Sequence, residues 1–197
     1  MHCFDHLPTG YREYLKVDLQ QDRRKALLIN GAALAAAVIL LAVGHFLLVP
    51  FYELFDFTSD SFLGMFFPMF VMLAGTVVYI ILHELTHGAV MKAFGARQVR
   101  FGFTSLYAFA GSEEDWFDRN AYRAVALAPL VVWGLIFTIA MILVPRSWFW
   151  VVYFWQVFNI TGAAGDIYVS FLTTRLPPEV LARDTGVSMT FFLPEKQ

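Results

Sequence analysis

The residues whose types and spacing could do chemistry form the pentapeptide His83-Glu84-Leu85-Thr86-His87. Two histidines four residues apart on a helix share one face, so both imidazoles can bind a single ion. The glutamate between them points to the adjacent sector, where it can take a proton from a metal-bound water without being a ligand. The pattern therefore predicts a zinc site with His83 and His87 as ligands and Glu84 as the catalytic base. The alternative is that these residues are merely interfacial polar groups at the end of a helix.

The elements that must position these residues are predicted to be membrane helices. Of the 197 residues, 58% are hydrophobic and 15% are charged, whereas a soluble domain usually carries about 25% charged residues. The charges cluster between long apolar runs, as a bilayer requires, and residues 62–82, just before the pentapeptide, contain none. Each apolar run supplies the roughly 20 residues that a span needs. We therefore predict an all-α integral membrane protein with four transmembrane helices, at about residues 26–50, 62–94, 121–144 and 148–173.

The distribution of charge predicts the orientation of these spans. The chain shows no internal repeat or linker, so residues 1–197 are predicted to form a single membrane-embedded metallopeptidase-like domain. Of its 14 Lys and Arg residues, all but Arg146 lie in the N-terminal segment, around the loop after the second span, or in the C-terminal segment. Cytoplasmic segments carry the excess of these residues, so both termini are predicted to be cytoplasmic, with residues 1–25 and 174–197 as tails.

Residues 97–110 are expected to form a short β-hairpin after the second span, or else a membrane-surface loop with aromatic anchors.

A catalytic zinc site needs a third protein ligand, and Asp166 is the candidate. Apart from the glutamate of the pentapeptide, it is the only carboxylate inside a predicted span. The second and fourth spans run in the same direction, and at ~1.5 Å per residue His83 and Asp166 lie about 32 and 27 Å from the outer face. The alternative is a carboxylate that pairs with Arg123 or Arg175. Asn159, on about the same face as Asp166, is predicted to orient substrate or a ligand, or to make an interhelical hydrogen bond.

Composition argues against several other functions. The single cysteine, Cys3, allows neither a disulfide within the chain nor a thiolate metal cluster, so a metal here must bind His, Asp or Glu. The net charge of -2 gives no support to nucleic-acid binding. A transporter with an ion site at the bilayer midplane fits poorly with four spans, no repeat and a site near one face.

Longer stretches of the sequence resemble known families. HELTHGAVMKAFGA followed by RQVRFGF is similar to the metal-binding helix and following strand of site-2 proteases, which are intramembrane zinc metalloproteases. The nearer resemblance is to a domain-of-unknown-function family of small bacterial membrane proteins described as putative zincin peptidases. It rests on the early HExxH, the RAVALAP of the third span and the closing GD pair. The resemblance covers roughly residues 62–173 and implies zinc held by His83, His87 and Asp166, with Glu84 as general base. FNITGAAGDI keeps the Asn and Asp of the site-2 protease pattern but lacks its prolines and its Leu-Asp-Gly element.

Together these features predict an enzyme, a membrane-embedded zinc metallopeptidase of the HExxH, site-2-protease-like type. The protein is expected to be a multi-pass protein of a bacterial cell membrane. It is expected to hydrolyse peptide bonds of membrane or juxtamembrane segments near the cytoplasmic face, with Glu84 activating a zinc-bound water. The expected partners are a membrane-protein or peptide substrate and the lipid bilayer, with no nucleic acid; no oligomeric state is predicted. The alternative is a non-catalytic zinc-binding membrane protein, a sensor or adaptor. Glu84 argues against that alternative, because metal binding alone does not need it.

Overall fold

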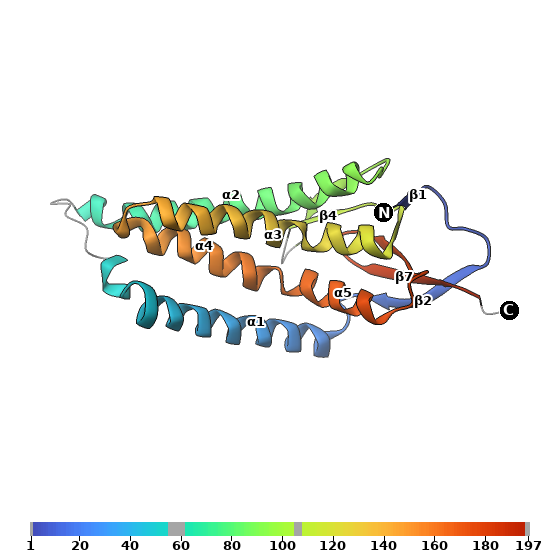
Figure 1. Cartoon of the computed structure of the whole chain (residues 1–197), viewed down its shortest axis with the longest axis horizontal. Coiled ribbons are helices and arrows are strands. Elements are labelled where there is room, and N and C mark those ends of the chain that lie inside the picture. The colour runs from blue at the N-terminus through green and yellow to red at the C-terminus, as the bar shows by residue number, and fades with distance from the viewer. Residues whose placement is uncertain (1, 55–61, 105–107, 196–197) are drawn as a thin grey trace.

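Apolar helices set the long axis of the molecule, and a β-sheet lies at one end of them (Figure 1). The structure is a computed structural model that describes residues 2–54, 62–104 and 108–195, with the backbone alone for residues 62–65. The helices are α1 (Arg23–Val43), α2 (Phe62–Ala93), α3 (Arg119–Leu143), α4 (Phe149–Gly162) and α5 (Ala164–Arg175), with single turns at Gly44–Leu48, Phe51–Leu54 and Arg146–Trp148.

Three helices of the described residues are long and apolar enough to cross a membrane. The prediction of four spans is wrong, because the fourth predicted segment, residues 148–173, is divided between α4, of 14 residues, and α5, of 12 residues. Neither helix reaches the roughly 20 residues that a span needs. The division falls at Ala163, whose ψ of 13° departs from the helical value. The three candidate spans are Arg23–Leu48, Phe66–Ala93 and Arg119–Leu143.

The all-α prediction is also wrong, because both predicted tails contribute strands to a five-stranded antiparallel sheet of order β1-β5-β6-β7-β2. In this sheet β2 pairs with β7, so that Leu15 lies opposite Phe191. Pairing between segments so far apart in sequence leaves no local signal, and a short strand with one buried face shows only a few alternating residues. The strands are β1 (Cys3–Phe4), β2 (Tyr11–Val17), β5 (Trp116–Asp118), β6 (Leu181–Asp184) and β7 (Met189–Pro194).

A second, two-stranded sheet follows α2, where the short hairpin was expected. It consists of β3 (Arg100–Phe103) and β4 (Ala108–Gly111), which pair antiparallel with Arg100 opposite Gly111. Residues 105–107, which also belong to the predicted hairpin segment, lie outside the described residues. The strand β4 packs against α2, the helix that carries the pentapeptide.

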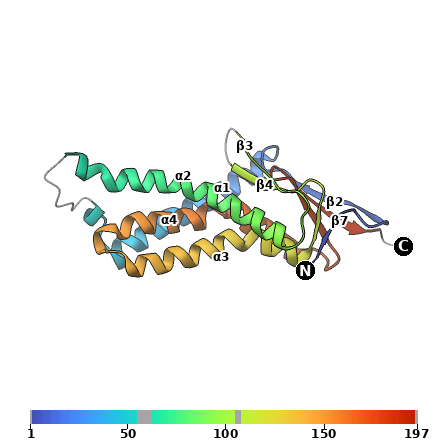
Figure 2. The same cartoon turned by 90° about the horizontal axis from the view of Figure 1, so that it is seen from above.

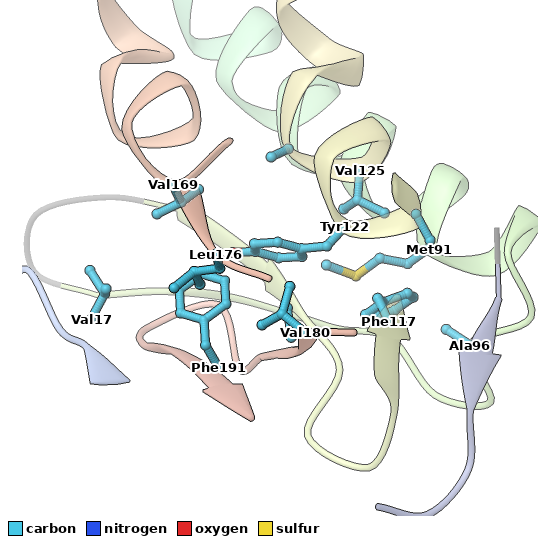
Figure 3. Close-up of a cluster of buried hydrophobic side chains, with 13 residues drawn as sticks. Val17, Met91, Ala96, Phe117, Tyr122, Val125, Val169, Leu176, Val180 and Phe191 are labelled. Carbon is cyan, nitrogen blue, oxygen red and sulfur yellow. The ribbon is translucent and has the colours of Figure 1, made fainter. Parts of the chain in front are cut away.

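The main hydrophobic core lies where the five-stranded sheet meets the end of α2, the start of α3 and α5 (Figure 3). The ring of Tyr122, in the first turn of α3, packs edge to face against the ring of Phe191 in β7. The two ring centroids are 5.8 Å apart. Val169 of α5 and Met91 of α2 complete the contact between the helices and the sheet, and both are 1% exposed. Burying each such side chain stabilises the fold by about 1.5–3 kcal/mol. The core therefore fixes the relative positions of α2, α3 and α5, the helices that carry the chemical groups.

The helices differ in how tightly they pack. Seen from above, α4 lies between α2 and α3 (Figure 2). A Cβ added at Gly75 of α2 would lie 2.1 Å from the Trp155 indole of α4, which shows how close these helices come. In contrast α1 has no buried residue and packs against α4 and α5. Ala26, Ile29 and Asn30, in its first turns, line a cavity.

Candidate metal centre

Three side chains with metal-binding groups meet between α2 and α5. His83 and His87 lie one turn apart on α2, and their Nε2 atoms are 3.2 Å apart. Asp166, in the first turn of α5, places Oδ2 3.3 Å from Nε2 of His83 and Oδ1 3.6 Å from Nε2 of His87. Within the described part of the chain, this is the one group of three or more His, Cys, Asp and Glu side chains close enough to hold an ion. The structure thus brings together the three side chains that the sequence predicted as metal ligands.

The spacing of these atoms fits zinc. Zinc binds imidazole nitrogen and carboxylate oxygen at about 2.0–2.2 Å in a tetrahedron, which places neighbouring ligand atoms about 3.3–3.5 Å apart. The three separations, 3.2, 3.3 and 3.6 Å, bracket that value. Two imidazoles and one carboxylate also form the His2-carboxylate set of catalytic zinc sites, which leaves a fourth position open.

The ring of His87 is oriented by a main-chain carbonyl of α3. Its Nδ1 lies 2.9 Å from the oxygen of Val125. A carbonyl oxygen only accepts, so Nδ1 carries the proton and donates, which leaves the lone pair of Nε2 for a metal. That carbonyl is available because the residue four positions on is Pro129, which has no N–H to donate in the helix. The proline of the RAVALAP stretch therefore leaves the Val125 carbonyl free to orient the His87 ring.

The ring of His83 is oriented by a chain of hydrogen bonds that crosses three helices. Asn159 of α4 donates from Nδ2 to the oxygen of Leu130 at 3.1 Å, so its Oδ1 faces Tyr79. The Tyr79 hydroxyl donates to that oxygen at 2.7 Å. With its proton used there, the hydroxyl accepts from Nδ1 of His83 at 2.9 Å. Nε2 of His83 is thus left as a metal-binding nitrogen, like that of His87.

The position of Asn159 favours one of its predicted roles. Its side chain is 0% exposed and contacts Tyr79 and α3. It is not among the residues that line the cavity at the metal centre. Its hydrogen bonds to Tyr79 of α2 and Leu130 of α3 are interhelical, which is the second of its predicted roles, and through Tyr79 they also connect it to His83. Sequence reasoning missed Tyr79, although its place one turn before His83 on the same helix face was a usable signal.

A cavity of ≈ 560 Å³ opens onto the metal centre, and Glu84 lines it beside the three ligands. Ala110, in β4, lines the same cavity as Glu84. Strand β4 forms one wall, α1 and the residues before it form a second, and the segment from β6 to β7 forms a third.

A metal-binding helix with an HExxH pentapeptide, a carboxylate from a second helix and an adjoining cavity define a metallopeptidase-like centre. The chain belongs to a family described as "Putative zincin peptidase", whose model matches residues 76–181, just over half of the chain. The matched stretch includes the three clustered ligands and Glu84. No curated protein and no solved structure matches the chain.

Proposed function

We propose that this protein is a membrane-embedded zinc peptidase. In this proposal zinc binds to His83, His87 and Asp166, and Glu84 is the general base. The observation that carries it is the near-tetrahedral spacing of two metal-binding Nε2 atoms and a carboxylate beside a cavity that Glu84 lines. Membership of the family of zincin peptidases supports the same reaction class.

The chain's own residues account for the proton transfers of hydrolysis. Zinc, when bound, would act as a Lewis acid that acidifies water and polarises the scissile carbonyl. The Glu84 carboxylate accepts a proton as the water oxygen adds to the carbonyl carbon. It then delivers that proton to the amine nitrogen as the carbon–nitrogen bond breaks.

The walls of the cavity support an extended peptide as the substrate. The residues from Ala108 to Ala110 of β4 line the cavity, and β4 pairs with β3 along one edge only within its two-stranded sheet. An extended segment could pair with the other edge, a common mode of peptide recognition. The candidate spans end near the site, so a membrane or juxtamembrane segment entering from the helix side is the substrate class we propose.

A set of single substitutions tests the proposal. Glu84→Gln should retain zinc and lose hydrolysis, because the amide cannot accept the proton; His83→Ala should lose both. Zinc content of the purified protein is measured by elemental analysis. Cleavage is followed by comparing membrane-protein fragments between cells that carry wild-type protein and cells that carry Glu84→Gln. Glu53→Gln, a carboxylate change on a turn at the other end of α1, is the matched control and should alter neither measurement.

Two outcomes would contradict parts of the proposal. If Glu84→Gln keeps both zinc and the wild-type fragment pattern, the protein is not a peptidase, and the non-catalytic zinc protein becomes the better description. Asp166→Asn should lower zinc occupancy, because a neutral amide is a poor zinc ligand. Full occupancy in that variant would remove Asp166 from the metal centre.

A further inference from the structure

A third acidic side chain, besides Glu84 and Asp166, lines the cavity from the wall formed by the segment from β6 to β7. Asp184, the last residue of β6, accepts a hydrogen bond at Oδ1 from the N–H of Gly186 at 2.8 Å. Its Oδ2 accepts from the Tyr122 hydroxyl at 3.1 Å. The Tyr122 ring is 0% exposed and lies at the centre of the core in Figure 3. These two donors hold the carboxylate in one orientation at the edge of the cavity.

Neither hydrogen bond explains why this residue is charged. The bond from Gly186 closes a turn that needs an oxygen acceptor, and an Asn side chain would supply one equally well. The Tyr122 hydroxyl can likewise bond to a neutral amide. Among the described residues, no Lys or Arg lies within ion-pair distance of Asp184. The neighbouring Arg183 places its guanidinium over the rings of Trp116 and Phe192, at 5.6 and 5.5 Å.

Burial without a Lys or Arg partner makes this carboxylate costly when ionised, although His87 interacts with it electrostatically. Burial raises the pKa of Asp184 from its ordinary value of 3.8 to about 6. At neutral pH the side chain is therefore still mainly anionic, although no Lys or Arg of the described residues pairs with it. A positive charge that arrives with a ligand would compensate that cost.

The rest of the cavity fits the same kind of ligand. None of the described residues that line it is Lys or Arg, and its acidic groups are Glu84, Asp166 and Asp184. Asp166 and Glu84 already have roles at the metal centre. Around Asp184 the wall is apolar, with Val187 and Met189 beside it. Such a wall suits the methylene groups of a long cationic side chain, whose charged end can reach a carboxylate.

We propose that Asp184 is a specificity-determining residue that binds a cationic group of the peptide close to the scissile bond. The group is a lysine or arginine side chain or a free α-amine, since all present a positively charged N–H donor. The inference rests on the proposed peptidase function and adds the substrate class to it. Asp184 lies beyond residues 76–181, so the family match does not assign this role.

Peptide binding to the zinc-loaded Glu84→Gln protein tests the inference without requiring cleavage. The full chain, in lipid nanodiscs, is titrated with fluorescent peptides that differ only by Lys or norleucine at one position at a time, each with a free or acetylated amino terminus. We expect one cationic peptide to bind about 10- to 100-fold more tightly than its neutral partner, the usual effect of a charge-assisted hydrogen bond. The acetylated arm distinguishes an α-amine from a side chain.

Adding Asp184→Asn to that protein should abolish the preference, whereas adding Glu113→Gln should preserve it. Glu113 is a suitable control because it is 52% exposed and pairs with Arg100 outside the cavity. Zinc content reports whether each variant is folded.

Equal binding of cationic and neutral peptides to the Glu84→Gln protein, or binding of neither, overturns the inference whatever Asp184→Asn does. A preference that survives Asp184→Asn in folded protein also overturns it. The preferred peptide is finally given to protein with Glu84 intact. If the peptide binds through Asp184 but is not cleaved, the peptidase proposal fails and the cation site stands. If peptides are cleaved equally well with and without a cationic group, the peptidase proposal stands and the inference about Asp184 fails.

Discussion

At the scale of single residues, the candidate metal centre depends on hydrogen-bond acceptors that contact the histidines on the side away from the predicted metal. Each histidine donates from Nδ1, to Tyr79 or to the carbonyl of Val125, so each presents Nε2 to the same point. The pentapeptide and Asp166 were predictable because a charge in an apolar run is rare. Tyr79 was identifiable in hindsight by spacing alone. Asp184 was not, because only the fold of the sheet brings it to the cavity.

Loss of the Tyr79 hydroxyl should weaken zinc binding. In Tyr79→Phe, Nδ1 of His83 loses its acceptor, and Asn159 loses its donor. Removing the partner of a metal-binding histidine typically reduces metal affinity about 10- to 100-fold. A competitive titration against a chelator measures the change. Tyr153→Phe is the matched control, since its hydroxyl donates to Leu40 of α1; equal zinc affinity in both variants would contradict the hydrogen-bond chain.

The pKa of Asp184 predicts a pH dependence of stability in zinc-free protein. Burial raises this pKa to about 6 from 3.8 in the unfolded chain, so the fold favours the protonated form. The resulting stabilisation is complete below about pH 4 and is lost as pH rises through about 6. Asp184→Asn is neutral throughout, so its melting temperature relative to wild type should rise between pH 5 and pH 7.5. A difference that is constant over this range would show that the carboxyl is not perturbed.

At the scale of elements, the sequence predicted helices by their apolar runs and missed what interrupts them. Three of the predicted segments overlap the three candidate spans closely. The break at Ala163 was not predictable, because the small residues around it, Gly162 and Gly165 among them, indicate close packing as readily as a helix end. The break matters, since it places Asp166 in the first turn of a new helix. The depth estimate placed Asp166 near His83 although it assumed one continuous helix over residues 148–173. The structure brings the two residues together but divides that segment into α4 and α5.

The proline in α3 should be needed for metal binding rather than for the helix. Pro129→Ala supplies an N–H that competes for the Val125 carbonyl, so His87 loses part of its orienting bond. We expect a more regular helix but zinc affinity lower by about 10-fold, the lower end of the effect of such partners. Pro68→Ala is the control, because that proline also lies within a helix, α2, but far along it from the ligands. Unchanged affinity in Pro129→Ala would mean that another acceptor orients His87.

At the scale of the whole molecule, the two ends differ in charge and in structure. The strands lie at one end (Figure 1), with nearly all of the Lys and Arg residues on that side of the candidate spans. At the other end Arg146 forms a two-bond ion pair with Glu53, at 2.6 and 2.9 Å. Arg146 holds the pKa of Glu53 below its ordinary value. The charge asymmetry can be read directly from the sequence, whereas the sheet could not be predicted because its strands come from both sides of the helical region.

The asymmetry predicts which end faces the cytoplasm. With Cys3 replaced by Ser, a cysteine at Ser147 should react with a membrane-impermeant maleimide in intact cells, since it lies in the loop beside Arg146. A cysteine at Gln21, before α1, should react only after the membrane is permeabilised. Both positions are exposed, so access through the membrane decides the result. Labelling of Gln21→Cys in intact cells would reverse the proposed orientation.

The pairing of β2 with β7 has a consequence for synthesis. Strand β2 leaves the ribosome before any helix, but its partner follows all five helices of the described chain. The cavity wall formed by Asp184, Val187 and Met189 emerges equally late. A nascent chain thus exposes its zinc ligands before the wall that would hold a peptide against them exists. The five-stranded sheet, and with it this wall of the cavity, is therefore completed only when the last strand has been synthesised.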